Sequence, residues 1–229
     1  MMTMKNIMIK VCGMRDVENI RSVAELGVDM IGFVFWKDSP RYVSMMSSGA
    51  GIMPDYAGDN GRCVNGGVKK VGVFVDGMPQ DIVTRVYNYG LDYVQLHGSE
   101  SAVMIDNLRR TLEPDIRQGV KIIKAISVET AEDVDKWREY DGVADMLLFD
   151  TKCTCAGGSG RMFDWNVLQN YDGSLPFILS GGIGPDDVQR VKDFDHPMLA
   201  GIDLNSRFET APAVKDVEAL KAFVRALRG

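Results

Sequence analysis

The sequence contains no long apolar run, since nowhere do about 18 or more apolar residues follow one another. A transmembrane helix needs about 20 such residues, so neither a spanning segment nor a membrane partner is expected. The first residues also lack the apolar stretch and small-residue cleavage site of a secretory signal. These absences predict a soluble, cytoplasmic protein.

Positive charge is not in excess. The 229 residues include 26 Lys and Arg against 32 Asp and Glu, a formal net charge of -6. A nucleic acid would be bound by a basic face, so no nucleic-acid partner is expected. Any anionic ligand must be held by local donors, and the expected partner is a small-molecule substrate.

Cysteine and histidine are scarce. Four cysteines in a chain of this length do not indicate a disulfide scaffold. Cys153 and Cys155 are closer together than the usual cysteine pair of a zinc site, and neither His97 nor His196 stands at ligand spacing from them. We therefore expect no metal.

Eight short runs rich in β-branched and apolar residues recur along the chain, and most precede apolar residues at helical spacing. Eight strand–helix units with right-handed crossovers, over about 220 residues, favour a closed barrel over an open, doubly wound sheet. We therefore predict an α/β fold, a single-domain (β/α)8 TIM barrel over residues 1–229. The expected strands are residues 7–11, 30–35, 70–75, 93–96, 120–126, 146–149, 177–179 and 199–204. The clearest helical stripes are Val17-Ile20-Val23-Ala24, Ile82-Val83-Val86-Tyr87, Val103-Ile105-Leu108-Leu112 and Ala219-Leu220-Phe223-Leu227.

One unit is irregular. Residues 45–68 contain six glycines and one proline, and they have no helical stripe. This composition supplies turn residues and little to bury. We expect a glycine-rich loop in place of much of the second helix, serving either as a lid or as a surface insertion.

Polar residues follow the expected strands, where such barrels carry their catalytic groups. Asp150 ends the sixth strand, and its apolar neighbours predict a raised pKa and a general-acid role; alternatively it binds loop amides. Asp164 stands beyond the next loop, where it could cap a helix. Cys12 ends the first strand and is either a general base or a small buried hydrophobe. As a base it must ionise at a cost of about 2 kcal/mol, so a cationic neighbour or backbone donors must help.

Further candidates follow other strands. Arg41 could grip a carboxylate with two hydrogen bonds or lie solvated in its loop. His97 either contacts a substrate or ties the rim together. Asp203 could bind a ligand N–H or pair with Lys10 or Lys124. Backbone amides of glycine-rich loops can bind phosphate, above all after the seventh and eighth strands. The phosphate candidates are Gly158, Ser159, Gly160, Gly181, Gly182, Asn205 and Ser206.

Together these segments resemble the phosphoribosylanthranilate isomerase family over nearly the whole chain. The motifs that carry the resemblance lie at residues 10–13, 32–35, 39–43, 71–75, 94–98, 150–151, 157–160, 163–165 and 179–182. The resemblance implies an Amadori rearrangement in tryptophan biosynthesis, which needs no cofactor or metal. It assigns the general acid to Asp150, the general base to Cys12 and the anthranilate carboxylate to Arg41. It places Asp203 near the anthranilate nitrogen, the 94–98 motif with Gln95 and His97 at the substrate, and the glycine loops at the phosphate.

The sequence departs from the family pattern in three places. Residues 45–68 replace the ordinary second helix. Arg207 stands where the family usually has glycine, and so does Ala213, which follows Pro212. Arg207 could add charge to the phosphate site or cap a surface turn. None of these departures involves the acid or the base.

Two rival functions remain. Related isomerases of histidine biosynthesis, or enzymes serving both pathways, carry aspartate where Cys12 stands. A barrel that only binds a phosphate ligand would need neither Cys12 nor Asp150. Because no apolar surface stripe remains after the helices are assigned, a monomer is expected.

Overall fold

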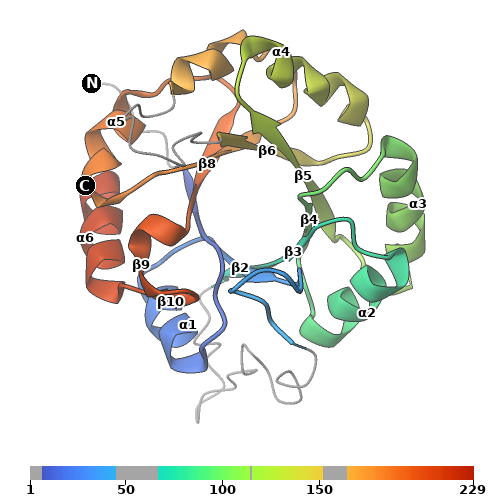
Figure 1. The fold of residues 1–229 in the computed structure, drawn as a ribbon, viewed down its shortest axis with the longest axis horizontal. Coiled ribbons are helices and arrows are strands. Elements are labelled where there is room, and N and C mark those ends of the chain that lie inside the picture. The colour runs from blue at the N-terminus through green and yellow to red at the C-terminus, as the bar shows by residue number, and fades with distance from the viewer. Residues whose placement is uncertain (1–6, 45–66, 114, 152–163) are drawn as a thin grey trace.

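The computed structural model describes residues 7–44, 67–113, 115–151 and 164–229. Among these residues, eight parallel strands form a closed barrel in chain order, with β8 paired to β1. Figure 1 shows helices forming a ring outside the strands. The predicted TIM barrel is confirmed, and the strands at 93–96 and 199–204 have the predicted bounds. The strands are β1 (Met8–Val11), β2 (Met30–Val34), β3 (Lys69–Phe74), β4 (Tyr93–Leu96), β5 (Lys121–Val128), β6 (Met146–Thr151), β7 (Phe177–Ser180) and β8 (Leu199–Leu204).

Helices occupy the connections, and all four predicted stripes lie in helices. The α-helices are α1 (Val17–Ala24), α2 (Pro79–Tyr89), α3 (Ala102–Leu112), α4 (Ala131–Val134), α5 (Val188–Asp193) and α6 (Val217–Arg228). The 3-10 helices are η2 (Asp135–Tyr140), η3 (Trp165–Asn170), η4 (Pro185–Asp187) and η5 (Ser206–Phe208). An antiparallel hairpin that the sequence analysis does not predict, β9 (Glu209–Ala211) and β10 (Val214–Lys215), follows β8.

Polar side chains define several helix starts. Asp16 precedes α1 and accepts a hydrogen bond from the amide of Asn19 at 2.8 Å. Asp164 precedes η3 and accepts one from the amide of Asn166 at 3.0 Å, so its predicted capping position is confirmed. Such caps satisfy amides that have no partner within the first turn.

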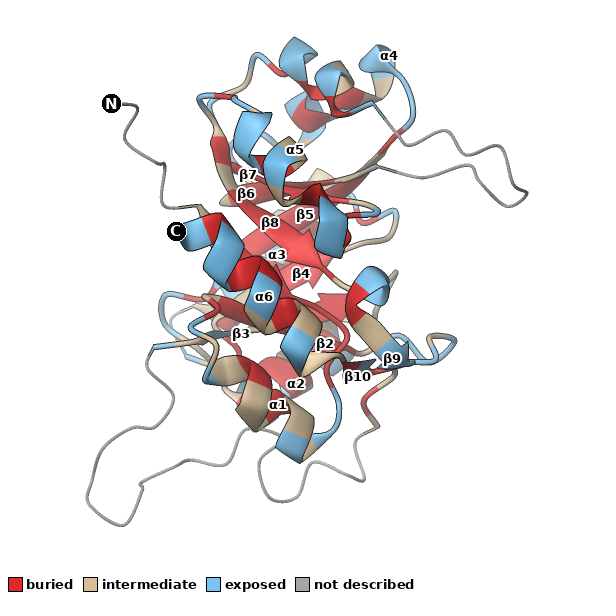
Figure 2. Ribbon diagram, turned by 90° about the vertical axis from the view of Figure 1, so that its left-hand side faces the viewer, coloured by how far each residue is buried: buried red, intermediate tan, exposed pale blue. Residues whose placement is uncertain are grey.

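Two apolar layers follow from the alternation of side chains along each strand. Outward side chains such as Phe149 and Phe177 pack with the helices in the main core. Inward side chains fill the barrel and include Met30, Val71 and Leu148. Figure 2 shows the barrel strands mostly buried, as their continuous apolar runs predict, whereas the hairpin β9–β10 is largely exposed.

Two residues assigned to helical stripes lie outside the core. Tyr87 and Val103 lie in the predicted helices but are 73% and 72% exposed. Each residue turns an α-helix by about 100°, so Val103 lies far around α3 from the buried Ile105. The buried face of each helix is therefore narrower than the set of apolar residues at helical spacing.

Several predictions concern residues outside the described part of the chain. These are residues 45–66, which hold most of the glycine-rich segment, and residues 152–163, which include Gly158, Ser159 and Gly160. None of the described helices combines the length and apolar character needed to cross a membrane.

Helix α3 offers a matched test of the core. Replacing the fully buried Ile105 by Ala removes packed methyl groups, which we expect to lower the free energy of unfolding by about 2–5 kcal/mol. Val103→Ala, on the exposed side of the same helix, is expected to change it by less than about 0.5 kcal/mol. Urea unfolding followed by circular dichroism measures both, and equal losses would contradict the described orientation of α3.

Candidate active site

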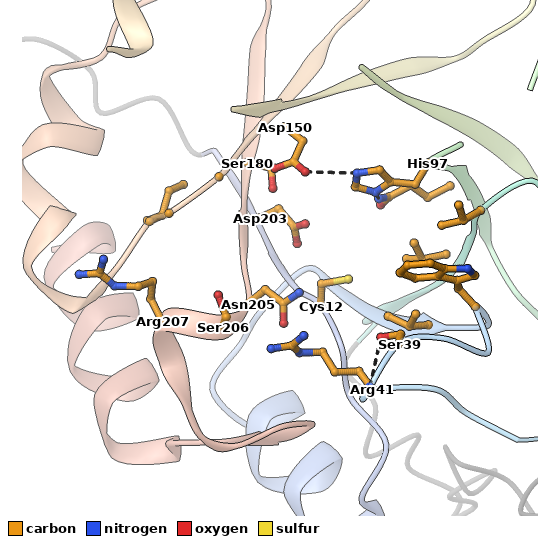
Figure 3. A pocket seen from close by; sticks show the side chains of 18 residues that line it. Cys12, Ser39, Arg41, His97, Asp150, Ser180, Asp203, Asn205, Ser206 and Arg207 are labelled. Atoms are coloured by element: carbon orange, nitrogen blue, oxygen red, sulfur yellow. Dashed lines mark hydrogen bonds and ion pairs between the residues drawn. The ribbon is translucent and has the colours of Figure 1, made fainter. Parts of the chain in front are cut away.

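A cavity of about 350 Å³ opens at the carboxyl ends of the strands, a size suited to a small molecule. Figure 3 shows side chains entering it from several strands and from the loops that follow them. All predicted site residues that the structure describes line this cavity: Cys12, Arg41, Gln95, His97, Asp150, Gly181, Gly182, Asp203, Asn205 and Ser206.

Asp150 projects from β6 toward His97, whose Nε2 lies 3.2 Å from Asp150 Oδ2 (Figure 3). The apolar sequence neighbours of Asp150 predict a raised pKa, and this prediction was wrong. Burial does raise the pKa, but hydrogen bonds from His97 and Ser180 and the charges of His97 and Lys10 together outweigh it, leaving the pKa below its ordinary value. Asp150 is therefore a carboxylate at neutral pH.

Gln95 sets the orientation of the His97 ring. Its amide Nε2 lies 3.0 Å from His97 Nδ1. The His97 ring is thus held between the Gln95 amide on one side and the Asp150 carboxylate on the other. Gln95 is 1% exposed, and its Oε1 has no hydrogen-bond partner among the described residues. The structure thus places Gln95 in the cavity wall, in contact with His97.

Cys12 lies just beyond β1 with its side chain turned toward the cavity (Figure 3). A Cβ at Gly32 of β2 would lie 2.8 Å from the Cys12 Sγ, so this glycine leaves room for the thiol. Burial raises the pKa of Cys12; the charges of Lys10 and Lys215 lower it, and that of Asp203 raises it. The net pKa lies above that of a free thiol. The cationic neighbours expected beside Cys12 are thus Lys10 and Lys215, although they do not outweigh its burial.

Lys10 and Asp203 form a buried ion pair between β1 and β8. Lys10 Nζ lies 2.9 Å from Asp203 Oδ1, and the side chains are 0% and 6% exposed. Burial lowers the pKa of Lys10, but the charges and hydrogen bonds of Asp203 and Cys12 together more than offset this and keep the ammonium protonated. Of the two predicted partners, Asp203 pairs with Lys10, whereas Lys124 pairs with Glu100 at 3.0 Å.

Arg41 is not a solvated loop residue. Its Nε donates to Glu209 Oε1 at 2.8 Å and its Nη2 donates to Oε2 at 2.5 Å, a two-pronged ion pair. Its Nη1 has no hydrogen bond within the described part of the chain. The guanidinium therefore keeps one donor group free beside the cavity.

The loops after β7 and β8 form the remaining wall. Gly181 and Gly182 have φ values of 98° and 71°, a region that favours glycine, so their amides can turn toward a ligand. Asn205 and Ser206 lie on the same cavity wall. Arg207 also lines the cavity, which favours a charge at this wall over a surface cap.

Three charged residues that surround these groups were not predicted to have a site role: Lys10, Glu209 and Lys215. One signal was available for Lys10, because it stands two residues before Cys12 and so shares its face of β1. Glu209 and Lys215 gave none, since they belong to the hairpin that was not predicted.

Comparison with known proteins identifies the family. Residues 9–226 match the family model of N-(5'phosphoribosyl)anthranilate (PRA) isomerase. The N-(5'-phosphoribosyl)anthranilate isomerases of Parabacteroides distasonis and Phocaeicola vulgatus are 43% and 40% identical to the chain. The alignments cover 96% and 97% of this chain and 92% and 98% of those proteins.

Solved structures agree. Phosphoribosyl anthranilate isomerase from Thermotoga maritima has a TM-score of 0.76 at 31% identity, covering 97% of this chain and 99% of that one. Another isomerase structure, in complex with reduced 1-(o-carboxyphenylamino)-1-deoxyribulose 5-phosphate, has a TM-score of 0.76 at 27% identity with the same coverage. A third structure contains monomers generated from the dimeric Thermotoga maritima enzyme, so the monomer expected here stays a prediction.

The matched family model spans almost the entire barrel, and two relatives exceed 30% identity over nearly their full length. The chain therefore belongs to the N-(5'-phosphoribosyl)anthranilate isomerase family, the isomerases of tryptophan biosynthesis.

Proposed function

We propose that the chain converts N-(5-phosphoribosyl)anthranilate to 1-(2-carboxyphenylamino)-1-deoxyribulose 5-phosphate by an Amadori rearrangement. The observation that carries this proposal is that Cys12 and Asp150 enter one cavity from β1 and β6. These strands are not neighbours in the barrel, because β7 and β8 lie between them on the shorter way round. A substrate between the two groups can thus exchange protons with an acid and a base on different sides.

Asp150 in its protonated form gives a proton to the ribose ring oxygen while the C1′–O bond breaks, leaving a Schiff base. The Cys12 thiolate then takes the C2′ proton, and the resulting enolamine tautomerises to the aminoketose. Each transfer by a positioned group is worth about 10² to 10⁴ in rate. Because both steps use only these side chains, the proposal includes no cofactor.

Other cavity residues bind the substrate in this proposal. Arg41 holds the anthranilate carboxylate through its free Nη1, and Asp203 faces the anthranilate nitrogen. His97 and Gln95 orient the acid and border the sugar. The phosphate lies on the loops after β7 and β8, at Gly181, Gly182, Asn205 and Ser206. The other predicted phosphate residues, Gly158, Ser159 and Gly160, belong to the part of the chain that the structure does not describe.

The proposed acid and base are tested by following the loss of anthranilate fluorescence from the substrate. We expect Cys12→Ala and Asp150→Asn each to lower kcat by at least about a hundredfold, because each removes one proton transfer. Asp135→Asn, an exposed carboxylate on η2, is the matched control and keeps full activity. If the natural protein leaves the substrate unchanged, or if either site variant keeps its rate, the assignment is wrong.

The pH profile of kcat/KM reflects the opposite pKa shifts of the two groups. The reaction needs Asp150 protonated and Cys12 ionised, whereas the pKa of Asp150 is lowered and that of Cys12 is raised. Below the first pKa both groups are protonated, and above the second both are ionised. We therefore expect a broad plateau with a fall at each end. A narrow peak near neutrality would show instead that the two pKa values lie close together.

Removing His97 is expected to move the acidic fall of that profile to higher pH. His97→Leu deletes the hydrogen bond and charge that counter the burial of Asp150, so the pKa of Asp150 rises. Activity then begins to decline at a higher pH than in the natural protein, whereas Asp135→Asn leaves the profile in place. An acidic limb unmoved by His97→Leu would assign that limb to another group.

A further inference from the structure

The hairpin β9–β10 carries two charged residues, Glu209 and Lys215, that contact the cavity-lining residues Arg41 and Asn205. Asn19 of α1 fastens the hairpin, because its side chain donates to the Lys215 carbonyl at 2.9 Å and accepts from the Lys215 amide at 2.8 Å. The hairpin is thus tied to the first helix of the barrel and does not hang as a free loop (Figure 1).

The Glu209 carboxylate is fixed by four hydrogen bonds. Its Oε1 accepts hydrogen bonds from Arg41 Nε at 2.8 Å, from Lys215 Nζ at 2.6 Å and from the Ala213 amide at 3.2 Å. Its Oε2 accepts from Arg41 Nη2. The side chain is 6% exposed. A carboxylate with these donors has one orientation, and it fixes the guanidinium plane in turn.

The other side of Arg41 is fixed by shape. A Cβ at Gly13, whose φ is 78°, would lie 2.5 Å from Arg41 Cδ and 2.8 Å from Asn205 Oδ1. Only glycine permits this approach. The arginine stem therefore lies between Gly13 and Glu209, and among the described residues Nη1 is its donor group without a hydrogen bond.

An arginine already paired with a carboxylate attracts a second carboxylate only weakly, because the pair has no net charge. Lys215 changes this balance. Its side chain is 0% exposed, and its Nζ bridges Glu209 and the cavity-wall residue Asn205, 2.9 Å from Asn205 Oδ1. Arg41, Glu209 and Lys215 together carry a net charge of about +1, which one ligand carboxylate neutralises. Burial lowers the pKa of Lys215, and the Glu209 carboxylate opposes that shift.

We propose that Lys215, acting through Glu209, is a positioning residue that selects substrates bearing a carboxylate on the aromatic ring. It counterbalances Glu209, so that the clamped Arg41 keeps its positive charge for the ligand. Lys215 does not touch the substrate, and its role rests on the proposed function because Arg41 is the carboxylate-binding group.

The test compares two stable ligands by isothermal titration calorimetry. One is the reduced product analogue with its ring carboxylate, and the other is the same molecule made from aniline, which lacks it. We expect the natural protein to prefer the first ligand and Lys215→Met to weaken it by about tenfold or more, since a nearby positive charge is lost. The affinity for the aniline ligand is expected to stay unchanged, which also shows that the variant is folded.

Charge rescue separates this role from a structural one. In Lys215→Met/Glu209→Gln an opposite pair is removed and Arg41 alone leaves a charge of +1, so we expect most of the lost carboxylate affinity to return. If Lys215→Met weakens both ligands equally, or if the double variant is weaker still, Lys215 is structural and the inference falls. If Lys215→Met does not fold, Lys215→Gln keeps a polar group and makes the same comparison.

Two control outcomes distinguish a failure of the proposed function from a failure of the inference about Lys215. A natural protein that binds neither ligand contradicts the proposed function and the inference together. A natural protein that turns over N-(5-phosphoribosyl)anthranilate but binds both ligands equally contradicts only the inference.

Discussion

The closure of the barrel between β1 and β8 is the constraint on which the site depends. The pairing places Lys10 opposite Asp203, and their side chains meet inside the barrel at 2.9 Å. A buried charge left without its partner costs about 3–5 kcal/mol, so each residue requires the other and the register is fixed. Cys12 lies two residues beyond Lys10, on the same face. The ion pair at the junction of β1 and β8 therefore also places Lys10 beside Cys12, the proposed base, as a cationic neighbour.

The same buried charges give the free site a protonation state opposite to the one that the proposed reaction uses. Asp150 rests ionised because His97, Ser180 and Lys10 outweigh its burial, whereas Cys12 rests protonated because its burial outweighs the two lysines. Only a small fraction of molecules holds the acid protonated and the base ionised at once. Each unit by which the pKa of Cys12 exceeds that of Asp150 adds about 1.4 kcal/mol to the free energy needed to reach this state.

Much of the fold could be predicted from local pattern. The strands are buried on both faces and so appear as continuous apolar runs, which is why β4 and β8 were found with their bounds. Helical stripes were found too, but Tyr87 and Val103 were counted into them because spacing alone does not show how wide the buried face is. The barrel rule also brought Cys12 and Asp150 to one end before any contact was known. The predicted direction of the Asp150 pKa shift was wrong. The sequence neighbours of Asp150 are apolar, but in the fold its carboxylate contacts His97, which lies 53 residues away along the chain.

By itself the sequence determined the barrel, the end of it that carries the polar groups, and the family, because strand periodicity, strand-end residues and motifs are local properties. Only the tertiary structure decided how those groups are charged and held. Arg41 meets Glu209 across 168 residues and Lys10 meets Asp203 across 193. Ionisation depends on distance and burial in three dimensions. Neither quantity is written in the order of residues along the chain.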